Sequence, residues 1–298
     1  MSSSSLDLFS LPQRILHKLF RAFLTDRLYA YTSLLRWDSV KPSITDPLTF
    51  NEKLRFLMLS YNPKKLNVYA DKVKVKELIS CIIGDQYIIP TFDVWKSLDD
   101  VTLTNLDSDC FIKCSNGSHL CFQWLSEYPL TLKELKSRVS PWFNNNYFND
   151  GREISYKGIK PVVFVEKLLV NNSDYCDLRD YKFFCFNGIP RFVQVDCDRQ
   201  TDHTRLFFDM DWNLMPFTLT YQRPSYHVIK PPNFAEMIDI VSKLSWMFPF
   251  VRVDLYDNGQ IYFGELTMFP DGAVTRFFPE RYNRIIGDFI NLDLPSFI

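Results

Sequence analysis

The second half of the chain alternates short apolar runs with turn residues, and this pattern restricts the fold more than any other feature. The runs are rich in β-branched and aromatic residues, which is typical of strands. An Asn-Gly pair at 187–188 separates two of them and indicates a hairpin. One predicted helix, at 234–248, interrupts the series. The pattern predicts an antiparallel sheet with helices packed on it, an α+β arrangement. The predicted strands are 162–169, 181–186, 191–195, 205–209, 251–255 and 261–266.

The first half of the chain predicts several helices and a smaller group of strands. Apolar residues recur at spacings of three and four over 6–37, which is typical of a helix. Thr49 and Glu52 have capping-box spacing, so a second helix is expected to begin there and to run to about Leu59. Further helices are expected at 70–83 and 130–143, and strands at 87–90, 94–95, 110–114 and 120–124.

Composition excludes several classes of protein. The chain has 298 residues, 46% of them hydrophobic and 23% charged, which suits one large or two small ordered domains. Its 34 basic and 35 acidic side chains argue against a nucleic-acid partner bound through phosphates. No stretch of about 18 apolar residues lacks charges, and the serine-rich start has no signal-peptide pattern. We therefore expect a cytoplasmic protein whose seven cysteines are mostly buried, reduced thiols.

The N-terminal helix has two interpretations, and the sequence leaves both open. Basic residues lie mostly opposite its apolar side. Such a helix can rest on an anionic membrane surface, which would place the protein peripherally at the inner face of the membrane. Alternatively, the helix packs on the protein's own core. The sequence predicts no oligomeric state. The basic residues are Arg14, His17, Lys18, Arg21 and Arg27.

The segment 252–267 carries the clearest candidate chemistry. Side chains repeat every two residues along a strand, so Arg252 and Asp254 share a face. The same rule places Glu265 and Thr267 together on the returning strand. Two carboxylates beside an arginine are typical of a site that holds Mg²⁺ against nucleotide phosphates. The alternative is a surface hairpin with a cross-strand pair of Arg and carboxylate.

Two further segments contain polar residues in apolar surroundings. Lys113 is flanked by aromatic and aliphatic residues, so it requires an anionic partner, either a phosphate or a structural carboxylate. The loop 115–118 follows and consists of serine, asparagine and glycine. The backbone amides of such a short loop can face phosphate. The strand around Glu166 and Lys167 ends at a polar loop, where backbone groups can meet an adenine ring. The alternative is an ordinary strand end, because any buried strand ends at a loop in a comparable way.

Taken in order, these motifs resemble the ATP-grasp superfamily, and more narrowly the TupA-like ATP-grasp family of bacterial surface-polysaccharide clusters, also described as amidoligases. The resemblance extends from about Thr45 to about Pro279. Each motif is loose by itself, whereas the ordered set is specific. The stretches that carry it are 49–55, 71–72, 111–113, 164–169, 180–188, 195–199, 248–256 and 265–267.

The resemblance implies an ATP-grasp fold, in which two α+β subdomains clasp ATP. It implies a helical N-terminal segment at 1–70, a first subdomain at 71–165, and a second subdomain at 166–298 that carries the Mg²⁺ and phosphate site. In relatives, the loop that follows the position of Lys113 ends in glycine, whereas this chain has His119 there. We expect a stiffer or differently shaped loop for that reason.

The resemblance also implies roles for individual residues. Arg252 would steady the transferred phosphoryl group. Relatives usually have Asn at the position of Thr267, but a threonine hydroxyl also offers oxygen to a metal. The implied ATP-binding residues are Lys72, Lys113, Ser115, Gly117, Ser118, Glu166, Lys167 and Leu169. The implied Mg²⁺ ligands are Asp254, Glu265 and Thr267, and the residues implied for the acyl phosphate and the acceptor are Lys182, Arg199 and Arg205.

The implied activity is a Mg·ATP-dependent carboxylate–amine ligase that acts through an acyl phosphate. It would join an amine or amino acid to a sugar acid in capsule or lipopolysaccharide biosynthesis, so its substrate would be a small molecule or a polysaccharide precursor. The alternative is a kinase or glycosyltransferase that acts on the same polymers. A kinase would use the same ATP site, and Asp-x-Asp triplets at 196–198 and 209–211 match the metal motif of glycosyltransferases. A non-catalytic scaffold would not require the ordered motifs.

Overall fold

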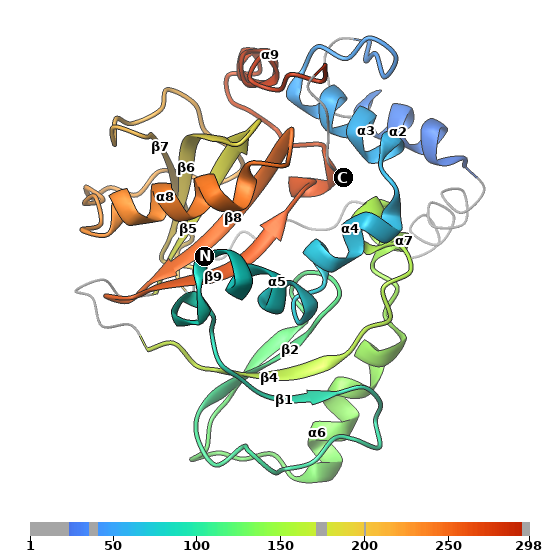
Figure 1. Cartoon of the computed structure of the whole chain (residues 1–298), viewed down its shortest axis with the longest axis vertical. Helices are drawn as coiled ribbons and strands as arrows, with labels where there is room; N and C mark the ends of the chain where they lie inside the picture. Colours follow the sequence, from blue (N-terminus) through green and yellow to red (C-terminus); the bar gives the residue numbers. More distant parts are fainter. Residues whose placement is uncertain (1–23, 36–40, 171–177, 200, 294–298) are drawn as a thin grey trace, which may run out of the picture.

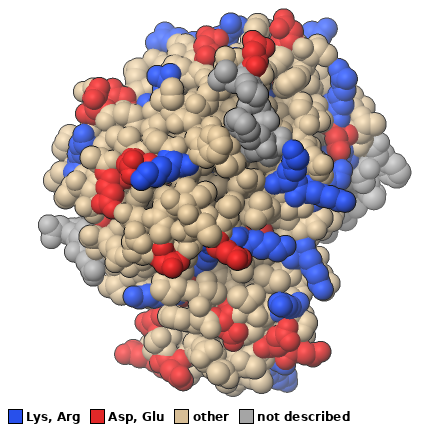
Figure 2. Space-filling view, in the orientation of Figure 1, with Lys and Arg blue, Asp and Glu red and all other residues tan. Residues whose placement is uncertain are grey.

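The computed structural model describes residues 24–35, 41–170, 178–199 and 201–293, which form two antiparallel sheets with helices around them (Figure 1). The smaller sheet has the strand order β1-β4-β2-β3, and the larger has the order β7-β6-β5-β8-β9. Helices α4 and α5 are drawn between the two sheets in this view. The face shown in Figure 2 narrows at the end that carries the smaller sheet, and basic and acidic side chains are mixed on it. The predicted α+β class is confirmed.

The strands lie close to their predicted positions. The smaller sheet consists of β1 (Thr91–Trp95), β2 (Cys110–Cys114), β3 (Cys121–Trp124) and β4 (Val163–Lys167). The larger sheet consists of β5 (Arg179–Phe186), β6 (Ile189–Cys197), β7 (Thr204–Asp209), β8 (Phe250–Asp257) and β9 (Ile261–Thr267). The predicted hairpin between β5 and β6 is confirmed, because Asn187 and Gly188 both have positive φ, at 49° and 79°.

The helices of the described residues surround these sheets. The α-helices are α2 (Asp26–Leu35), α3 (Phe50–Ser60), α4 (Pro63–Ala70), α5 (Lys74–Ile83), α6 (Leu132–Val139), α7 (Phe148–Gly151), α8 (Phe234–Ser245) and α9 (Arg281–Gly287). The 3₁₀ turns are η1 (Asp85–Tyr87), η2 (Ser140–Asn144), η3 (Ile154–Tyr156) and η4 (Pro270–Gly272). None of the helices in the described part of the chain is long and apolar enough to cross a membrane.

Several predicted boundaries are wrong, and each has a local cause. The helix expected at 70–83 begins later, at Lys74 of α5, because the buried Asp71 carboxylate accepts hydrogen bonds from the amides of residues 73 and 74 and holds the preceding turn; α4, at 63–70, was not predicted. The strand expected at 87–90 is mostly absent: η1 occupies 85–87 and Ile88 forms a single bridge to Phe263. The helix expected at 130–143 tightens into η2 at Pro141. Of the helix expected at 6–37, α2 covers 26–35, and residues 6–23 and 36–37 lie outside the described residues.

The cysteines follow the prediction only in part. Cys110, Cys114, Cys185 and Cys197 are buried free thiols. Cys81 and Cys121 are exposed free thiols instead, and Cys121 lies on the outward side of β3 at the edge of its sheet. Cys176 lies outside the described residues.

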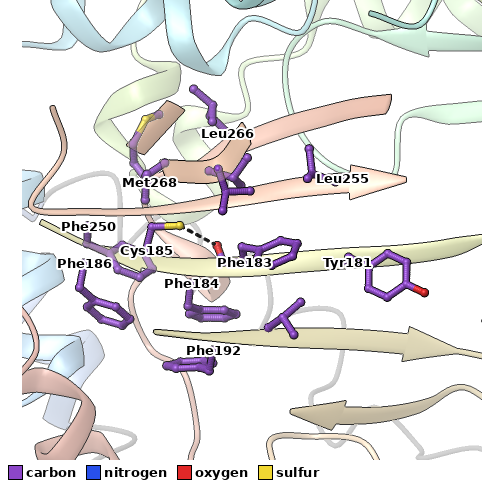
Figure 3. Packing of buried hydrophobic residues seen from close by; sticks show 14 of the residues in the cluster. Tyr181, Phe183, Phe184, Cys185, Phe186, Phe192, Phe250, Leu255, Leu266 and Met268 are labelled. Atoms are coloured by element: carbon purple, nitrogen blue, oxygen red, sulfur yellow. Dashed lines mark hydrogen bonds between the residues drawn. The ribbon is translucent and has the colours of Figure 1, made fainter. Parts of the chain in front are cut away.

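One face of the larger sheet is apolar along its whole length and is covered by α8. The side chains of β5, β6 and β8 on this face are packed against the helix, as in the stacked pair of Phe183 and Phe234, whose ring centroids are 5.7 Å apart. The opposite face is divided. At one end Phe184, Phe192 and Phe250 pack together with Phe186, as Figure 3 shows. At the other end the same strands carry charged residues, so the core stops where the polar half begins.

The two faces of the smaller sheet differ in polarity. One face packs on α6 through a core that includes Trp95, Ile112, Val165 and Leu135. Since side chains alternate along a strand, the other face carries Lys113 and Glu166 with neighbouring phenylalanines, and α5 lies over it, with the Lys76 ammonium 5.3 Å from the Phe164 ring centroid. Each sheet therefore has one apolar face and one face with charged residues.

The N-terminal helices are tied to the C-terminal end of the chain. Thr49 and Glu52 form the predicted capping box of α3. The buried Asn51 side chain both donates to and accepts from the Thr275 backbone, at 2.9 Å in each direction. The Lys53 ammonium donates to two carbonyl oxygens at the end of α9, those of Gly287 and Ile290. These contacts hold α3 beside the larger sheet, where it forms part of the wall of the candidate site.

Candidate functional site

The polar half of the larger sheet brings three predicted residues into one row. Lys182 of β5 lies opposite Asp254 of β8, and Asp254 lies opposite Glu265 of β9. A bulge at Gly264 sets this last register, because Glu265 pairs with Asp254 whereas Phe263 pairs with Leu255. A Cβ atom at Gly264 would lie 3.0 Å from the Asp254 carbonyl oxygen, so the close approach of the two strands requires glycine there. The two carboxylates thus share a face, as the hairpin pattern predicts.

Arg252 joins the two carboxylates. Its Nε donates to Asp254 Oδ1 at 2.7 Å and its Nη2 donates to Asp254 Oδ2 at 2.8 Å. The same Nη2 donates to Glu265 Oε1 at 3.1 Å and to the Thr267 hydroxyl at 3.0 Å. Burial opposes ionisation of Glu265, but Lys72 and Arg252 outweigh it and lower the pKa of this carboxyl to about 2. Glu265 is therefore a carboxylate at neutral pH.

Lys182 and Arg199 meet at a second carboxylate that the resemblance did not assign. Lys182 Nζ donates to Asp180 Oδ2 at 2.5 Å and to Asp254 Oδ2 at 2.7 Å. Arg199 Nη1 donates to Asp180 Oδ2 at 2.9 Å. Burial lowers the pKa of Lys182, but Asp180 and Asp254 outweigh burial and raise it. Lys182 is therefore a buried cation held between two strands.

Arg205 lies on β7, two strands from β5, and its partner Asp196 on β6 lies opposite Asp180. Its Nε donates to Asp196 Oδ1 at 2.5 Å, and Gln194 and His203 also lie against that carboxylate. Burial raises the pKa of Asp196, but the neighbouring Arg205 outweighs it, so the pKa is lowered well below its ordinary value. The structure thus groups Lys182 and Arg199 around Asp180 and places Arg205 with Asp196.

Lys72 connects the predicted phosphate loop to β9. Its Nζ donates to the Gly117 carbonyl oxygen at 2.6 Å and lies 3.5 Å from Glu265 Oε2. Gly117 has φ of +104°, and a Cβ atom there would lie 2.7 Å from the Tyr147 ring. His119 also adopts a positive φ, at 61°, where relatives are expected to have glycine. The loop is therefore shaped by two left-handed residues and by the close contact with Tyr147.

The serines of this loop differ in their surroundings. Ser115 is buried, and its hydroxyl accepts a hydrogen bond from the Val162 amide at 3.1 Å, so its side chain holds the loop to the strand region beside it. Ser118 is exposed and, with Gly117, lines the cavity described below. Of the two predicted serines, only Ser118 presents its side chain to that cavity.

Glu166 and Lys113 lie together on the charged face of the smaller sheet, with a lysine that sequence reasoning missed. Lys113 is in hydrogen-bond contact with Glu166 Oε2, and Lys76 Nζ lies 2.5 Å from Glu166 Oε1. Burial raises the pKa of Glu166, but the two lysines outweigh it and lower the pKa. A carboxylate is thus one anionic partner of Lys113. The signal for Lys76 was its place one helical turn after Lys72.

The two remaining predicted residues lie at the end of β4. Lys167 is exposed, and its amide donates to the Pro90 carbonyl oxygen at 2.9 Å. Leu169 is half-buried. Neither residue lines the cavity that contains the phosphate loop. They lie on the chain segment that leads from the smaller sheet toward the larger one.

A cavity of about 620 Å³ lies between the phosphate loop and the Arg252 cluster. One wall contains Gly117 and Ser118, and another contains Arg252, Glu265 and Thr267. Helix α2 and the segment from Tyr147 to Tyr156 close the remaining sides. Sequence reasoning missed the polar residues of these sides, because they come from loops and from helix faces that no motif marks. They are Tyr29, Thr32, Ser33, Tyr147, Asp150, Glu153 and Tyr156. Arg55 of α3 also lines the cavity; it belongs to the stretch 49–55 of the resemblance but was given no role.

Glu153 predicts a specific pH dependence of stability. Burial raises the pKa of this carboxyl from 4.5 to about 8. The folded protein therefore keeps a proton that the unfolded chain loses, so stability falls as the pH rises from about 4.5 to about 8. The limiting slope for one group is about 1.4 kcal/mol per pH unit. Urea unfolding at several pH values in this window should show a flatter profile for Glu153→Gln than for wild type. Parallel profiles would contradict the assignment.

The chain was compared with known families, curated proteins and solved structures. The model of the TupA-like ATP-grasp family matches residues 52–291. No curated protein sequence matches the chain. D-alanine–D-alanine ligase from Bacillus anthracis is 15% identical, with 75% of this chain and 66% of that chain covered and a TM-score of 0.43. The ATP-grasp ligase PsnB in complex with a minimal precursor is 11% identical, with 73% and 60% covered and a TM-score of 0.39.

The D-cycloserine synthetase DcsG is 11% identical, with 88% of this chain and 94% of that chain covered and a TM-score of 0.40. The chain spans slightly less than two thirds of the length of the Bacillus anthracis ligase. The family match includes all of the motifs from Asp71 to Thr267 that led to the resemblance. It covers most of the sequence, and the two antiparallel sheets are those expected of the ATP-grasp fold. The chain therefore belongs to the TupA-like ATP-grasp family and is an enzyme of the ATP-grasp fold.

Proposed function

We propose that the protein is an ATP-dependent carboxylate–amine ligase that acts through an acyl phosphate. The observation that carries the proposal is the shared cavity of about 620 Å³. The phosphate loop and the cluster of Arg252, Glu265 and Thr267 open onto the same space. Its volume is within the usual range for small-molecule sites, and its walls combine cations, carboxylates and tyrosines. ATP phosphates and a sugar- or amino-acid-sized substrate can therefore meet there.

The carboxylates of the cluster fit a Mg²⁺ ion completed by phosphate oxygens. Asp254 and Glu265 offer hard oxygen atoms from opposite strands. Asp254 Oδ1 accepts one hydrogen bond, from Arg252, and Glu265 Oε2 lies 3.5 Å from Lys72, so each oxygen keeps a lone pair. Thr267 would add a hydroxyl oxygen. When bound, the ion would neutralise charge on the transferred phosphate.

We propose that the two sheets are the two subdomains that clasp ATP. Because β4 includes Glu166 and Lys167, the first subdomain extends through Lys167 and the second begins after it. The helices before Asp71 form the N-terminal segment. The charged face of the smaller sheet, with Lys113, Glu166 and the added Lys76, would receive the nucleotide, and the half-buried Leu169 would lie against the adenine ring.

The reaction would proceed in two balanced steps. A carboxylate oxygen of the substrate attacks the γ-phosphorus of ATP, the bond to the bridging oxygen breaks, and ADP leaves. The amine nitrogen then attacks the acyl carbon, the bond to phosphate breaks, and inorganic phosphate and a proton leave. Lys72 and Arg252 would neutralise the charge that develops on the phosphoryl group. Lys182, Arg199 and, through Asp196, Arg205 would lie on the side of the acyl phosphate.

The substrate would come from bacterial surface-polysaccharide assembly, as the family relationship suggests. A sugar acid would supply the carboxylate, and an amine or amino acid would be the acceptor, in capsule or lipopolysaccharide biosynthesis. The positions of the Asp-x-Asp triplets do not favour a glycosyltransferase. Asp196 is bound by Arg205, Asp198 accepts from the Tyr226 hydroxyl, and Asp209 accepts from two amides of its own turn. Neither triplet contributes to the lining of the cavity onto which Glu265 opens.

Nucleotide binding tests the proposal without knowledge of the acceptor. We expect calorimetry to show that the ATP analogue AMPPNP binds wild type in a Mg²⁺-dependent manner. Lys113→Ala should weaken this binding by about 10- to 100-fold, because a charge-assisted hydrogen bond to phosphate contributes about 1.5–3 kcal/mol. Glu166 keeps Lys76 as a partner in this variant, so the fold should persist.

Lys133→Ala is the matched control, because Lys133 is exposed on α6, far from the charged face. It should bind the nucleotide as wild type does. A wild-type protein that does not bind AMPPNP, or a Lys113→Ala protein that binds it equally well, would contradict the proposal. Given binding, phosphate release should then be screened with sugar acids paired with amines. Release with hydroxyl acceptors and without any amine would identify a kinase instead.

A further inference from the structure

Glu153 is a buried carboxyl group that has no partner in the part of the chain that the structure describes. It lies between α7 and η3 and lines the large cavity with only 9% of its surface exposed. No hydrogen bond or ion pair of the described residues reaches its carboxylate oxygens. Its oxygen atoms therefore open onto the cavity, where a ligand can reach them. Among the charged side chains, Arg55 does most to favour ionisation of Glu153.

The surroundings of Glu153 favour a cation. Glu265 and Asp271 line the same cavity and act against its ionisation, whereas Arg55 and Arg252 favour it. Arg252 is already bound to Asp254 and Glu265. An incoming positive charge would therefore relieve the repulsion among these carboxylates. The neighbouring hydroxyl of Tyr147 stays protonated, since burial raises its pKa, and so it is available as a neutral hydrogen-bond partner.

We infer that Glu153 binds the ammonium group of the amine acceptor and takes up the proton that this amine must lose. The inference rests on the proposed ligase function and assigns its second substrate to one side of the cavity. An amine attacks only as the free base, so a proton acceptor is needed beside it. Glu153 shares the cavity with Arg252 and the phosphate loop, where the acyl phosphate would form. Glu153 is mostly protonated in the free protein at neutral pH, since its pKa is about 8, and an approaching ammonium group favours its ionised form, which can then accept the proton of the amine.

The N-terminal helix closes this side of the cavity. Tyr29, Thr32 and Ser33 of α2 are part of its lining. The residue before Glu153, Arg152, holds the start of the helix by donating to the Leu24 carbonyl oxygen at 2.7 Å and to Asp26 at 3.0 Å. The amine side therefore has a wall of hydroxyl groups and an aromatic ring, which suits a small polar amine.

Binding of simple amines tests the inference. Ethanolamine and D-glucosamine serve as probes in saturation-transfer NMR titrations of the full chain with Mg²⁺ and AMPPNP. We expect both to bind wild type and to bind Glu153→Gln at least 10-fold more weakly. AMPPNP affinity should be the same in the two proteins. Glu127→Gln is the matched control, because Glu127 is exposed in the loop after β3. It should bind the probes as wild type does.

The outcomes separate this inference from the proposed function. Equal binding of the amines to wild type and Glu153→Gln overturns the inference, and so does a wild-type protein that binds neither amine but binds AMPPNP. Failure of wild type to bind AMPPNP overturns the proposed function as well. If Glu153→Gln does not fold, as judged by its melting transition, Glu153→Asp replaces it. That variant keeps the charge but withdraws it by one methylene, and it should weaken amine binding by a smaller factor.

Discussion

Replacing Glu265 by Gln should reduce turnover by at least about 10³-fold while the protein remains folded. The substitution keeps the size of the side chain but removes the charge from one of the two carboxylates proposed to hold Mg²⁺. In wild type, Glu265 Oε1 accepts hydrogen bonds from Arg252 and Thr267, and the amide oxygen of glutamine can keep these contacts. Asp254 remains to balance Arg252. The loss should therefore appear in catalysis rather than in stability.

The measurement is ADP formation with whichever substrates support turnover in wild type, together with AMPPNP binding at several Mg²⁺ concentrations. The variant should lose most of the Mg²⁺ dependence of binding. Glu77→Gln, an exposed glutamate on α5, is the control and should behave as wild type in both assays. A Glu265→Gln enzyme that turns over normally would rule out Glu265 as a metal ligand.

Replacing Lys182 by Met should destabilise the protein by about 3–5 kcal/mol, the usual cost of removing one partner of a buried ion pair. Lys182 is the cation between Asp180 and Asp254, and the side chains of these two aspartates are 2% and 3% exposed. Without the lysine, Asp180 keeps only Arg199, and the lysine hydrogen bond to Asp254 Oδ2 is lost. Methionine fills similar volume, so the effect should be electrostatic. Urea unfolding at pH 7 measures it.

The double variant Lys182→Met with Asp180→Asn should regain part of the lost stability, because it removes one of the two buried carboxylates that lose the lysine. Lys243→Met is the comparison for an ion pair in water. Lys243 pairs with Asp239 at the surface of α8, where both side chains are more than half exposed, and its loss should change stability little. If Lys182→Met proved no more costly than Lys243→Met, the cluster would not contribute to the fold in the manner described.

The strands and the capping of α3 could be predicted closely because they depend on neighbours in sequence. The capping box needs only Thr49 and Glu52, which are one helical turn apart. The hairpins β5–β6 and β8–β9 depend on Asn187-Gly188 and on the turn that contains Gly259. The helix boundaries near Asp71 and Pro141 were predicted less well, since a carboxylate that binds backbone amides and a proline each change the course of a helix in spite of a favourable apolar pattern.

Sequence alone determined that Arg252 and Asp254 share a face, because strand periodicity is a local property. Glu265 reaches that face through the bulge at Gly264, since a regular pairing would place Gly264 opposite Asp254 and Glu265 on the other side of the sheet. The ordered motifs also identified the family. Only the tertiary structure decided which groups meet across the sheets. Lys182 reaches Asp254 because β5 pairs with β8, and Lys76 reaches Glu166 because α5 packs on the smaller sheet.

The cavity and the isolated Glu153 likewise exist only in the folded chain. Their walls come from α2, from the loop after β2 and from β9, which are far apart in the sequence. Packing of apolar faces brings these segments together, and it does so without regard to the polar residues carried on their other sides. The chemistry of the amine side is therefore set by long-range packing, whereas the phosphate and metal side follows largely from local strand geometry.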